Sequence, residues 1–171
     1  MVSTFKEITP LEWDDNVFQK IGSEWMLITV GNEQKQNMMT ASWGGIGVLW
    51  NKNVTFAFVR PSRYSYGFME ENDSYALCFL GKGYRDALNF CGTKSGRDVD
   101  KIKETGLTVK FSNVTPYFEE AKVVVICKKQ YVQDMDPKGF LNEAILPACY
   151  ANGDFHRVYV GEIEKILIKE C

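Results

Sequence analysis

Apolar residues along this chain fall mostly into short runs and two-residue alternations, which is the pattern of β-strands. The segments that show it are residues 25–30, 37–43, 54–59, 74–80, 122–132 and 157–169. The first two flank a polar turn, which predicts a hairpin. The alternation of the last segment is interrupted at Gly161, so a bulge or sharp bend is expected there.

Helix signals are short and lie between these strands. Residues 9–12 (TPLE) form a capping box with proline at the first helical position, which predicts a helix that begins there and ends before Gly22. Residues 64–72 have room for about two helical turns. Residues 84–91 and 98–104 have helical patterns, and a capping-box pattern (SGRD) begins at Ser95 before the second.

The connections between the strands decide the fold class. Strands follow one another with short or medium connections, without the steady strand–helix alternation of a parallel sheet. We therefore expect a mainly β fold with inserted helices, in the form of a closed antiparallel barrel. With 171 residues and no internal linker, the chain is expected to be a single domain over residues 1–171.

Composition excludes several classes of function. The 20 basic and 22 acidic residues give a net charge of −2 and a pI near 5.5, so no overall field attracts nucleic acid or anionic lipid. No apolar stretch approaches the length of a membrane span, and the N-terminus lacks a signal-peptide pattern. The five cysteines indicate reduced thiols, and a single histidine excludes a His-rich metal site. We expect a cytoplasmic protein with no metal, nucleic-acid or membrane partner.

A dinucleotide-binding motif is incomplete in this sequence. Residues 81–86 (GKGYRD) begin like the G-x-G-x-x-G fingerprint, but Asp86 replaces the third glycine and no βαβ unit surrounds it. A Rossmann site is therefore not expected. Cys91 invites a second hypothesis, that of a redox thiol, but a lone cysteine on the apolar side of a predicted helix is more often a core residue.

The first candidate functional segment is residues 37–45 (NMMTASWGG), a predicted strand whose composition changes midway. Asn37, Thr40 and Ser42 offer amide and hydroxyl groups, and the glycines after Trp43 allow the main chain to approach a ligand closely. Such a strand could hydrogen-bond the edge of a planar heterocycle. The alternative is a bent barrel strand whose polar side chains face water.

A second candidate segment is residues 60–66 (RPSRYSY), where a strand ends and a helix is predicted to begin. Two guanidinium groups, two serine hydroxyls and free helix N-terminal amides within seven residues suit a phosphate monoester, which carries about −1.5 to −2 charges. The alternative is a surface loop whose arginines pair with Glu70, Glu71 or Asp73.

In order and spacing these segments resemble the flavin reductase-like family of FMN-binding split barrels, and more closely its flavoredoxin-type branch. The family pattern runs through an N-x-M-T-x-x-W strand, a basic and hydroxyl-rich segment, S-G-R-D-x-D-K, and a G-x-x-H or G-D-H step into G-E-I or G-E-V. The matching stretches are residues 37–43 (NMMTASW), 60–66 (RPSRYSY), 95–101 (SGRDVDK), 153–156 (GDFH) and 161–163 (GEI). Phe155 is an insertion in the G-D-H step.

This resemblance implies an antiparallel split β-barrel and a set of site residues around noncovalently bound FMN. Residues toward the isoalloxazine and ribityl parts would be Asn37, Thr40, Ser42 and Trp43, with Met39 and Ala41 as further cofactor-binding positions on the same strand. Arg60, Ser62, Arg63, Tyr64 and Ser65 would surround the phosphate and ribityl end, and Lys101 would approach the flavin. His156 would stand near the flavin as the catalytic residue, its alternative being a strand-end histidine bonded to backbone.

The resemblance also implies an activity and an assembly. The expected protein is a homodimer with FMN at the subunit boundary, which accepts hydride from NADH or NADPH and passes electrons to free flavin, a metal complex or a protein partner. One alternative is an FMN-binding electron carrier that is reduced by a protein partner, since no nicotinamide pocket is evident in the sequence. Another is an aromatic-rich barrel that binds single-stranded nucleic acid, which the acidic balance opposes.

Overall fold

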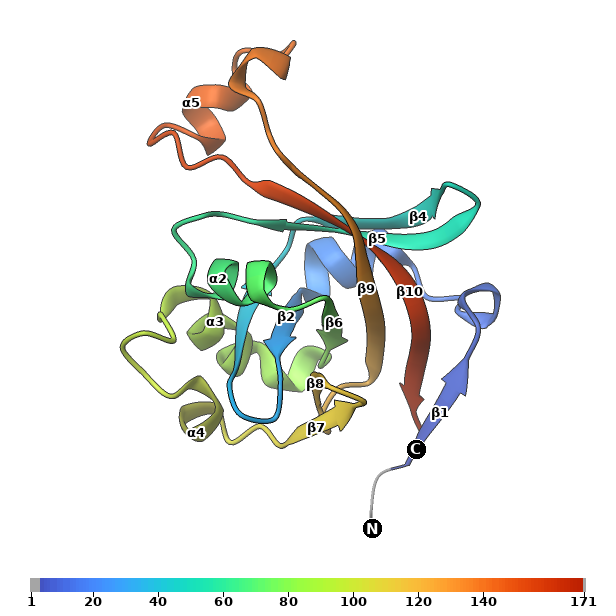
Figure 1. The fold of residues 1–171 in the computed structure, drawn as a ribbon. Coiled ribbons are helices and arrows are strands. Elements are labelled where there is room, and N and C mark those ends of the chain that lie inside the picture. The colour runs from blue at the N-terminus through green and yellow to red at the C-terminus, as the bar shows by residue number, and fades with distance from the viewer. Residues whose placement is uncertain (1–3, 171) are drawn as a thin grey trace.

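One antiparallel sheet forms the body of the computed structural model, which describes residues 4–170 (Figure 1). Its eight strands are β1 (Phe5–Ile8), β2 (Met26–Gly31), β3 (Gln36–Ala41), β4 (Gly44–Leu49), β5 (Lys52–Val59), β6 (Ser74–Phe79), β9 (Val123–Asp134) and β10 (Arg157–Lys169). They follow the order β3-β2-β6-β9-β10-β5-β4, and β1 also pairs with β10. The fold class is therefore mainly β, as predicted. β7 (Val109–Ser112) and β8 (Thr115–Phe118) form a separate hairpin.

The barrel is split, as the resemblance to the split-barrel family predicted, and not closed, as the strand pattern alone suggested. β3 and β4 lie at the two ends of the strand order, and no pairing joins them within residues 4–170. The predicted strand over residues 37–43 ends at Ala41, and only Ser42 and Trp43 separate it from β4. The chain thus passes from one end of the sheet to the other across Ser42 and Trp43, which leaves these two residues at the opening.

Two hydrophobic clusters fill the two sides of the central strands. Successive residues of β2 belong to different clusters: Met26 and Ile28 lie on one side of the sheet and Leu27 on the other. All three are fully buried. One cluster lies inside the barrel against α2 (Tyr64–Glu71), and the other packs against α3 (Arg85–Thr93) and β8. Burial on both faces explains why these strands are continuous apolar runs in the sequence.

The bulge expected at Gly161 is confirmed. The pairing of β10 with β9 shifts register between Val160 and Gly161. A Cβ atom at Gly161 would lie 2.4 Å from the hydroxyl oxygen of Tyr75 and 2.9 Å from Cβ of Cys127. Any other residue would therefore clash with the barrel interior at this point.

The predicted N-terminal helix is wrong in extent. The capping box of Thr9 and Glu12 is present, but it opens only a 3₁₀ turn, Pro10–Glu12. A second helix, α1 (Val17–Gln19), begins after Asn16, whose side chain accepts hydrogen bonds from two of its amides. A π-helical turn then continues the segment to Glu24, past Gly22. Because the two N-cap residues Thr9 and Asn16 lie close together, the segment forms separate short turns instead of one helix.

The helix predicted over residues 98–104 begins later than expected. α4 spans Lys101–Thr105, and its N-cap is Asp100, whose side chain accepts a hydrogen bond from the amide of Lys103. The pattern that begins at Ser95 forms a turn instead, in which the Ser95 hydroxyl oxygen accepts from the amide of Arg97. This turn places the segment 95–101 across the end of α3.

The connection between β9 and β10 extends away from the sheet (Figure 1). It carries α5 (Ile145–Cys149), which the sequence analysis missed, and the aromatic side chains of Phe140, Tyr150 and Phe155 pack on one another within it. Within residues 4–170, no helix is long and apolar enough to cross a membrane.

Candidate functional site

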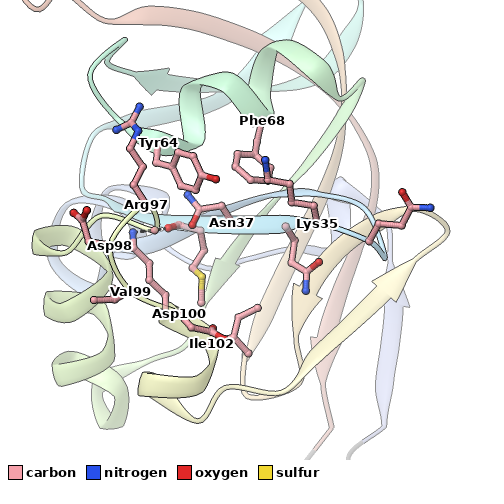
Figure 2. Close-up of a pocket in the computed structure, with 14 residues that line it drawn as sticks. Lys35, Asn37, Tyr64, Phe68, Arg97, Asp98, Val99, Asp100 and Ile102 are labelled. Atoms are coloured by element: carbon pink, nitrogen blue, oxygen red, sulfur yellow. Dashed lines mark hydrogen bonds between the residues drawn. The ribbon is translucent and has the colours of Figure 1, made fainter.

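Three adjoining cavities form a groove along β3, from the opening of the barrel to the start of α4. Cavity A, about 210 Å³, is lined by Met39, Thr40, Ala41, Ser42, Trp43, Phe58, Arg60, Arg63 and His156. Cavity B, about 250 Å³, is lined by Asn37, Met39, Ser62, Arg63, Tyr64, Ser65, Thr93, Lys94, Ser95, Arg97 and Lys101. Cavity C, about 510 Å³, shares Asn37, Tyr64, Arg97 and Lys101 with cavity B (Figure 2). The groove brings together every site residue that the sequence analysis named.

Cavity A combines flat apolar walls with polar edges. Met39 comes from β3, at one end of the strand order, and Phe58 comes from β5, the strand next to the other end. The sequence analysis missed Phe58, although its place two residues before Arg60 on an alternating strand is a usable signal. The Thr40 hydroxyl donates to the carbonyl of Leu88 at 2.5 Å, which ties the edge of this cavity to α3.

His156 is buried in cavity A and does not fit the alternative of a histidine bonded to backbone. Its Nδ1 lies 2.8 Å from the Tyr150 hydroxyl, and its ring contacts Trp43 at 5.4 Å between centroids. Burial and the nearby charge of Arg60 lower the pKa of His156 to about 4. The imidazole is therefore neutral at physiological pH. Tyr150 is a partner that the sequence analysis missed, because it lies in the irregular connection.

Cavity B is strongly cationic. Arg63, Lys94, Arg97 and Lys101 line it, and none of its lining residues carries a carboxylate. Asn37 is buried and donates from Nδ2 to the Ser65 hydroxyl oxygen at 2.8 Å. This corrects the alternative in which the polar side chains of the strand all face water.

Two of these cations are held at the C-terminal end of α3. Arg63 donates from Nη1 to the carbonyl of Gly92 at 2.9 Å, and Lys101 donates from Nζ to the carbonyls of Met38 at 2.8 Å and Cys91 at 2.9 Å. Helix C-terminal carbonyls carry partial negative charge and favour cations. Burial nevertheless lowers the pKa of Lys101 to about 8.

Arg60 and Ser62 hold the β9–β10 connection against the barrel. Arg60 donates to the carbonyls of Cys149 and Asp154, both at 2.8 Å, and its guanidinium lies over the ring of Tyr150. The Ser62 hydroxyl donates to the carboxylate of Asp154 at 2.5 Å. The arginines of this segment therefore contact backbone carbonyls, whereas Glu70, offered as a partner in the alternative reading, pairs with Arg157.

The three buried cysteines of residues 4–170 give no sign of thiol chemistry. Burial raises the pKa of the Cys91 thiol, and Cys78 and Cys127 are buried with raised pKa values as well. A thiol whose pKa is raised is a poor nucleophile at neutral pH. Cys171 lies outside the described residues. No cluster of metal-ligating side chains occurs in residues 4–170.

The chain belongs to the family described as flavin reductase like domain, whose model matches residues 18–171. Among solved structures, it is similar to a flavoredoxin from Methanosarcina acetivorans, at 21% identity over 84% of this chain and 67% of that one, with a TM-score of 0.64. It is also similar to an FMN-binding protein from Thermus thermophilus, at 18% identity over 95% and 78% of the two chains, with a TM-score of 0.65.

A third similar structure is the nitrilotriacetate monooxygenase component B from Bacillus cereus, at 16% identity over 95% and 81% of the two chains, with a TM-score of 0.67. At these identities the structural likeness establishes the split-barrel fold. No curated protein matches the sequence significantly. Membership of this family indicates a flavin-related function for this chain.

The residues of the groove fit a flavin mononucleotide. Cavity A offers aromatic and thioether walls to a planar ring, with hydroxyl groups at its edge. Cavity B, next to it, offers four cations and the hydroxyl group of Ser65 to a phosphate. Met39 and Arg63 line both cavities, so a ring in one and a phosphate in the other can belong to one ligand.

Proposed function

We propose that this protein binds FMN noncovalently along β3 and acts as an NAD(P)H-dependent flavin oxidoreductase of the flavoredoxin type. The observation that carries the proposal is cavity B, which has four cationic side chains and no carboxylate in a protein whose net charge is −2. Arg63 and Lys101 contact the end of α3, and Lys94 and Arg97 add two further positive charges to the same cavity. This positive charge complements the negative charge of a phosphate monoester.

The residues of cavity A orient the ring. Trp43 and Phe58 limit its position, and Ser42 offers a hydrogen bond to its edge. Bound FMN would supply the capacity to accept a hydride from NADH or NADPH and to release electrons one or two at a time. His156, held by Tyr150 and neutral, would position the nicotinamide without adding a positive charge beside it. Because its pKa is about 4, the reduction rate should show no inflection from His156 between pH 6 and 8.

We further propose a homodimer with the groove at the subunit boundary. Large apolar side chains are exposed near the opening, with Trp43 at 48% and Phe18 at 86% of their full exposure. Exposed apolar groups of this size are typical of an interface. Light scattering of the FMN-loaded protein at micromolar concentration should give the mass of two chains, and a monomer with bound FMN would contradict the proposal.

Anaerobic reduction tests the enzymatic part. The purified protein should bind FMN with a visible change in the flavin spectrum, and NADH or NADPH should then bleach it. Riboflavin, which lacks the phosphate, is the matched ligand and should bind much more weakly. If neither nicotinamide reduces the bound flavin while dithionite does, the second candidate applies, namely an FMN-binding electron carrier reduced by a protein partner. Failure to bind FMN would contradict both candidates.

A further inference from the structure

Cavity C lies beyond the phosphate region and has about twice the volume of cavity B. Figure 2 shows Tyr64 and Phe68 on one side of it and the segment from Asp98 to Ile102 on the other. A mononucleotide whose ring lies in cavity A and whose phosphate lies in cavity B leaves this space unused. The groove therefore extends beyond the end of FMN.

The lining of cavity C combines aromatic rings with cations. The Lys35 ammonium lies 4.9 Å from the Phe68 ring centroid and 5.8 Å from that of Tyr64, and the Arg97 guanidinium lies 5.0 Å from that of Tyr64. Lys35 and Arg97 are exposed at the surface, and the Arg97 guanidinium also donates to the carbonyl of Ser62 at 3.2 Å, so its remaining N–H groups face outward for a ligand. Aromatic rings and guanidinium planes stack on nucleobases, and the cations bind phosphate.

One polar atom of this cavity lacks a partner. Gln36 Oε1 is buried and accepts no hydrogen bond from any residue in the range 4–170, and Gln36 lines cavity C. A buried amide oxygen without a partner calls for an explanation. If the Gln36 side chain turns toward cavity C, a ligand with an exocyclic amino group would supply the missing donor. Asp98, on the opposite wall, can accept hydrogen bonds from sugar hydroxyls.

We propose that cavity C binds an adenylate group, with its base against Tyr64 and Phe68 and its phosphate toward Arg97 and cavity B. This inference rests on the proposed flavin site, because it assigns the space that continues from the flavin phosphate. Two sources carry this group: the adenylate half of FAD, bound in place of FMN, and the adenylate half of a nicotinamide dinucleotide.

The first test uses 5′-AMP as the probe on the flavin-free full-length protein. Lys35→Glu places a negative charge in cavity C and leaves cavities A and B unchanged, because Lys35 lines neither. AMP affinity should fall about fivefold in this variant. Lys138→Glu, the same charge change at an exposed site in the β9–β10 connection, is the matched control and should bind AMP like the wild type.

The two sources are separated by further titrations of the same variants. If FAD is the source, Lys35→Glu weakens FAD binding and leaves FMN binding unchanged. If a nicotinamide dinucleotide is the source, the variant instead raises the NADH or NADPH concentration needed for half-maximal flavin reduction.

The proposal is overturned if the wild type does not bind AMP at millimolar concentration, or if both variants bind it equally. FMN binding is measured separately. A protein that binds AMP but not FMN would contradict the proposed function alone, and one that binds FMN but not AMP would contradict this inference alone.

Discussion

Arg60 and Arg63 are three residues apart on one segment, yet they stabilise different parts of the molecule. Arg60 donates to the carbonyls of Cys149 and Asp154 in the β9–β10 connection, and Arg63 donates to the carbonyl of Gly92 at the end of α3. Both line cavity A, but only Arg63 also lines cavity B. The comparison teaches that a pair of arginines in a phosphate-like motif can divide between support of the fold and contact with a ligand.

The largest expected effect is on the Arg63 side of the comparison. Arg63→Ala should weaken FMN binding about hundredfold, since a charge-assisted hydrogen bond contributes about 1.5–3 kcal/mol. Riboflavin binding should change much less, because it has no phosphate. Titration of both ligands into wild type and variant measures the difference. Equal losses for FMN and riboflavin would mean that Arg63 only supports α3.

Arg60→Ala should mainly affect stability. The loss of two hydrogen bonds to carbonyls should lower the free energy of unfolding by about 2 kcal/mol and expose the β9–β10 connection to proteases. FMN affinity should change by less than about threefold, since a contact outside cavity B contributes little to phosphate binding. Urea unfolding and limited proteolysis measure the first effect. A loss of FMN affinity as large as that of Arg63→Ala would remove the distinction between the two arginines.

The pH dependence of FMN binding sharpens the assignment of Lys101, which shares the carbonyl of Cys91 with Arg63. Burial lowers the pKa of Lys101 to about 8, so the ammonium is lost as the pH rises through that value. If FMN prefers the protonated form, its dissociation constant should rise about tenfold between pH 7 and pH 9. Lys101→Met should bind more weakly and show no such rise. A wild-type constant that stays level over this range would exclude contact between the ammonium and the phosphate.

Deprotonation of Lys101 has the opposite effect on stability: rising pH should weaken FMN binding but raise the free energy of unfolding. Between pH 8 and about 10.5, the unfolded chain keeps a proton on Lys101 that the folded chain has released. The free energy of unfolding should therefore gain a positive contribution from Lys101 as the pH rises through this window. The contribution should be missing in Lys101→Met, and urea titrations at several pH values compare the two.

The smallest effect is expected at Ser62. Its hydroxyl donates to the exposed carboxylate of Asp154, so Ser62→Ala should lower the free energy of unfolding by about 0.5 kcal/mol. FMN affinity should fall less than in Arg63→Ala. A loss of affinity that matches the arginine variant would show that the hydroxyl binds the phosphate instead of Asp154.

The sequence predicted the strands well where local pattern and burial agree. The runs that became β2, β6 and β9 are buried on both faces, so their apolar character is continuous and easily recognised. β4 was missed because its three glycines hide the alternation of apolar and polar residues. α5 was missed because it has only five residues, one of them Pro147, which is unusual inside a helix.

The sequence predicted which segments would lie together, but it did not predict the contacts that their side chains make. Motif order identified the segments, and the groove brings them together. The motifs could not reveal that Arg60 binds the carbonyl of Cys149, or that Tyr150 holds His156, because both partners lie in an irregular segment without a pattern of its own. Contacts of this kind depend on tertiary structure, which local sequence does not encode.

The shared carbonyl of Cys91 has a consequence for the kinetics of ligand binding. Arg63 and Lys101 are both held by hydrogen bonds to main-chain oxygens. Their side chains lose little rotamer freedom when an anion arrives, so the entropic penalty of association is small and no rearrangement has to precede capture. Differences in affinity among anionic ligands should then appear as differences in residence time, with association rates nearly constant.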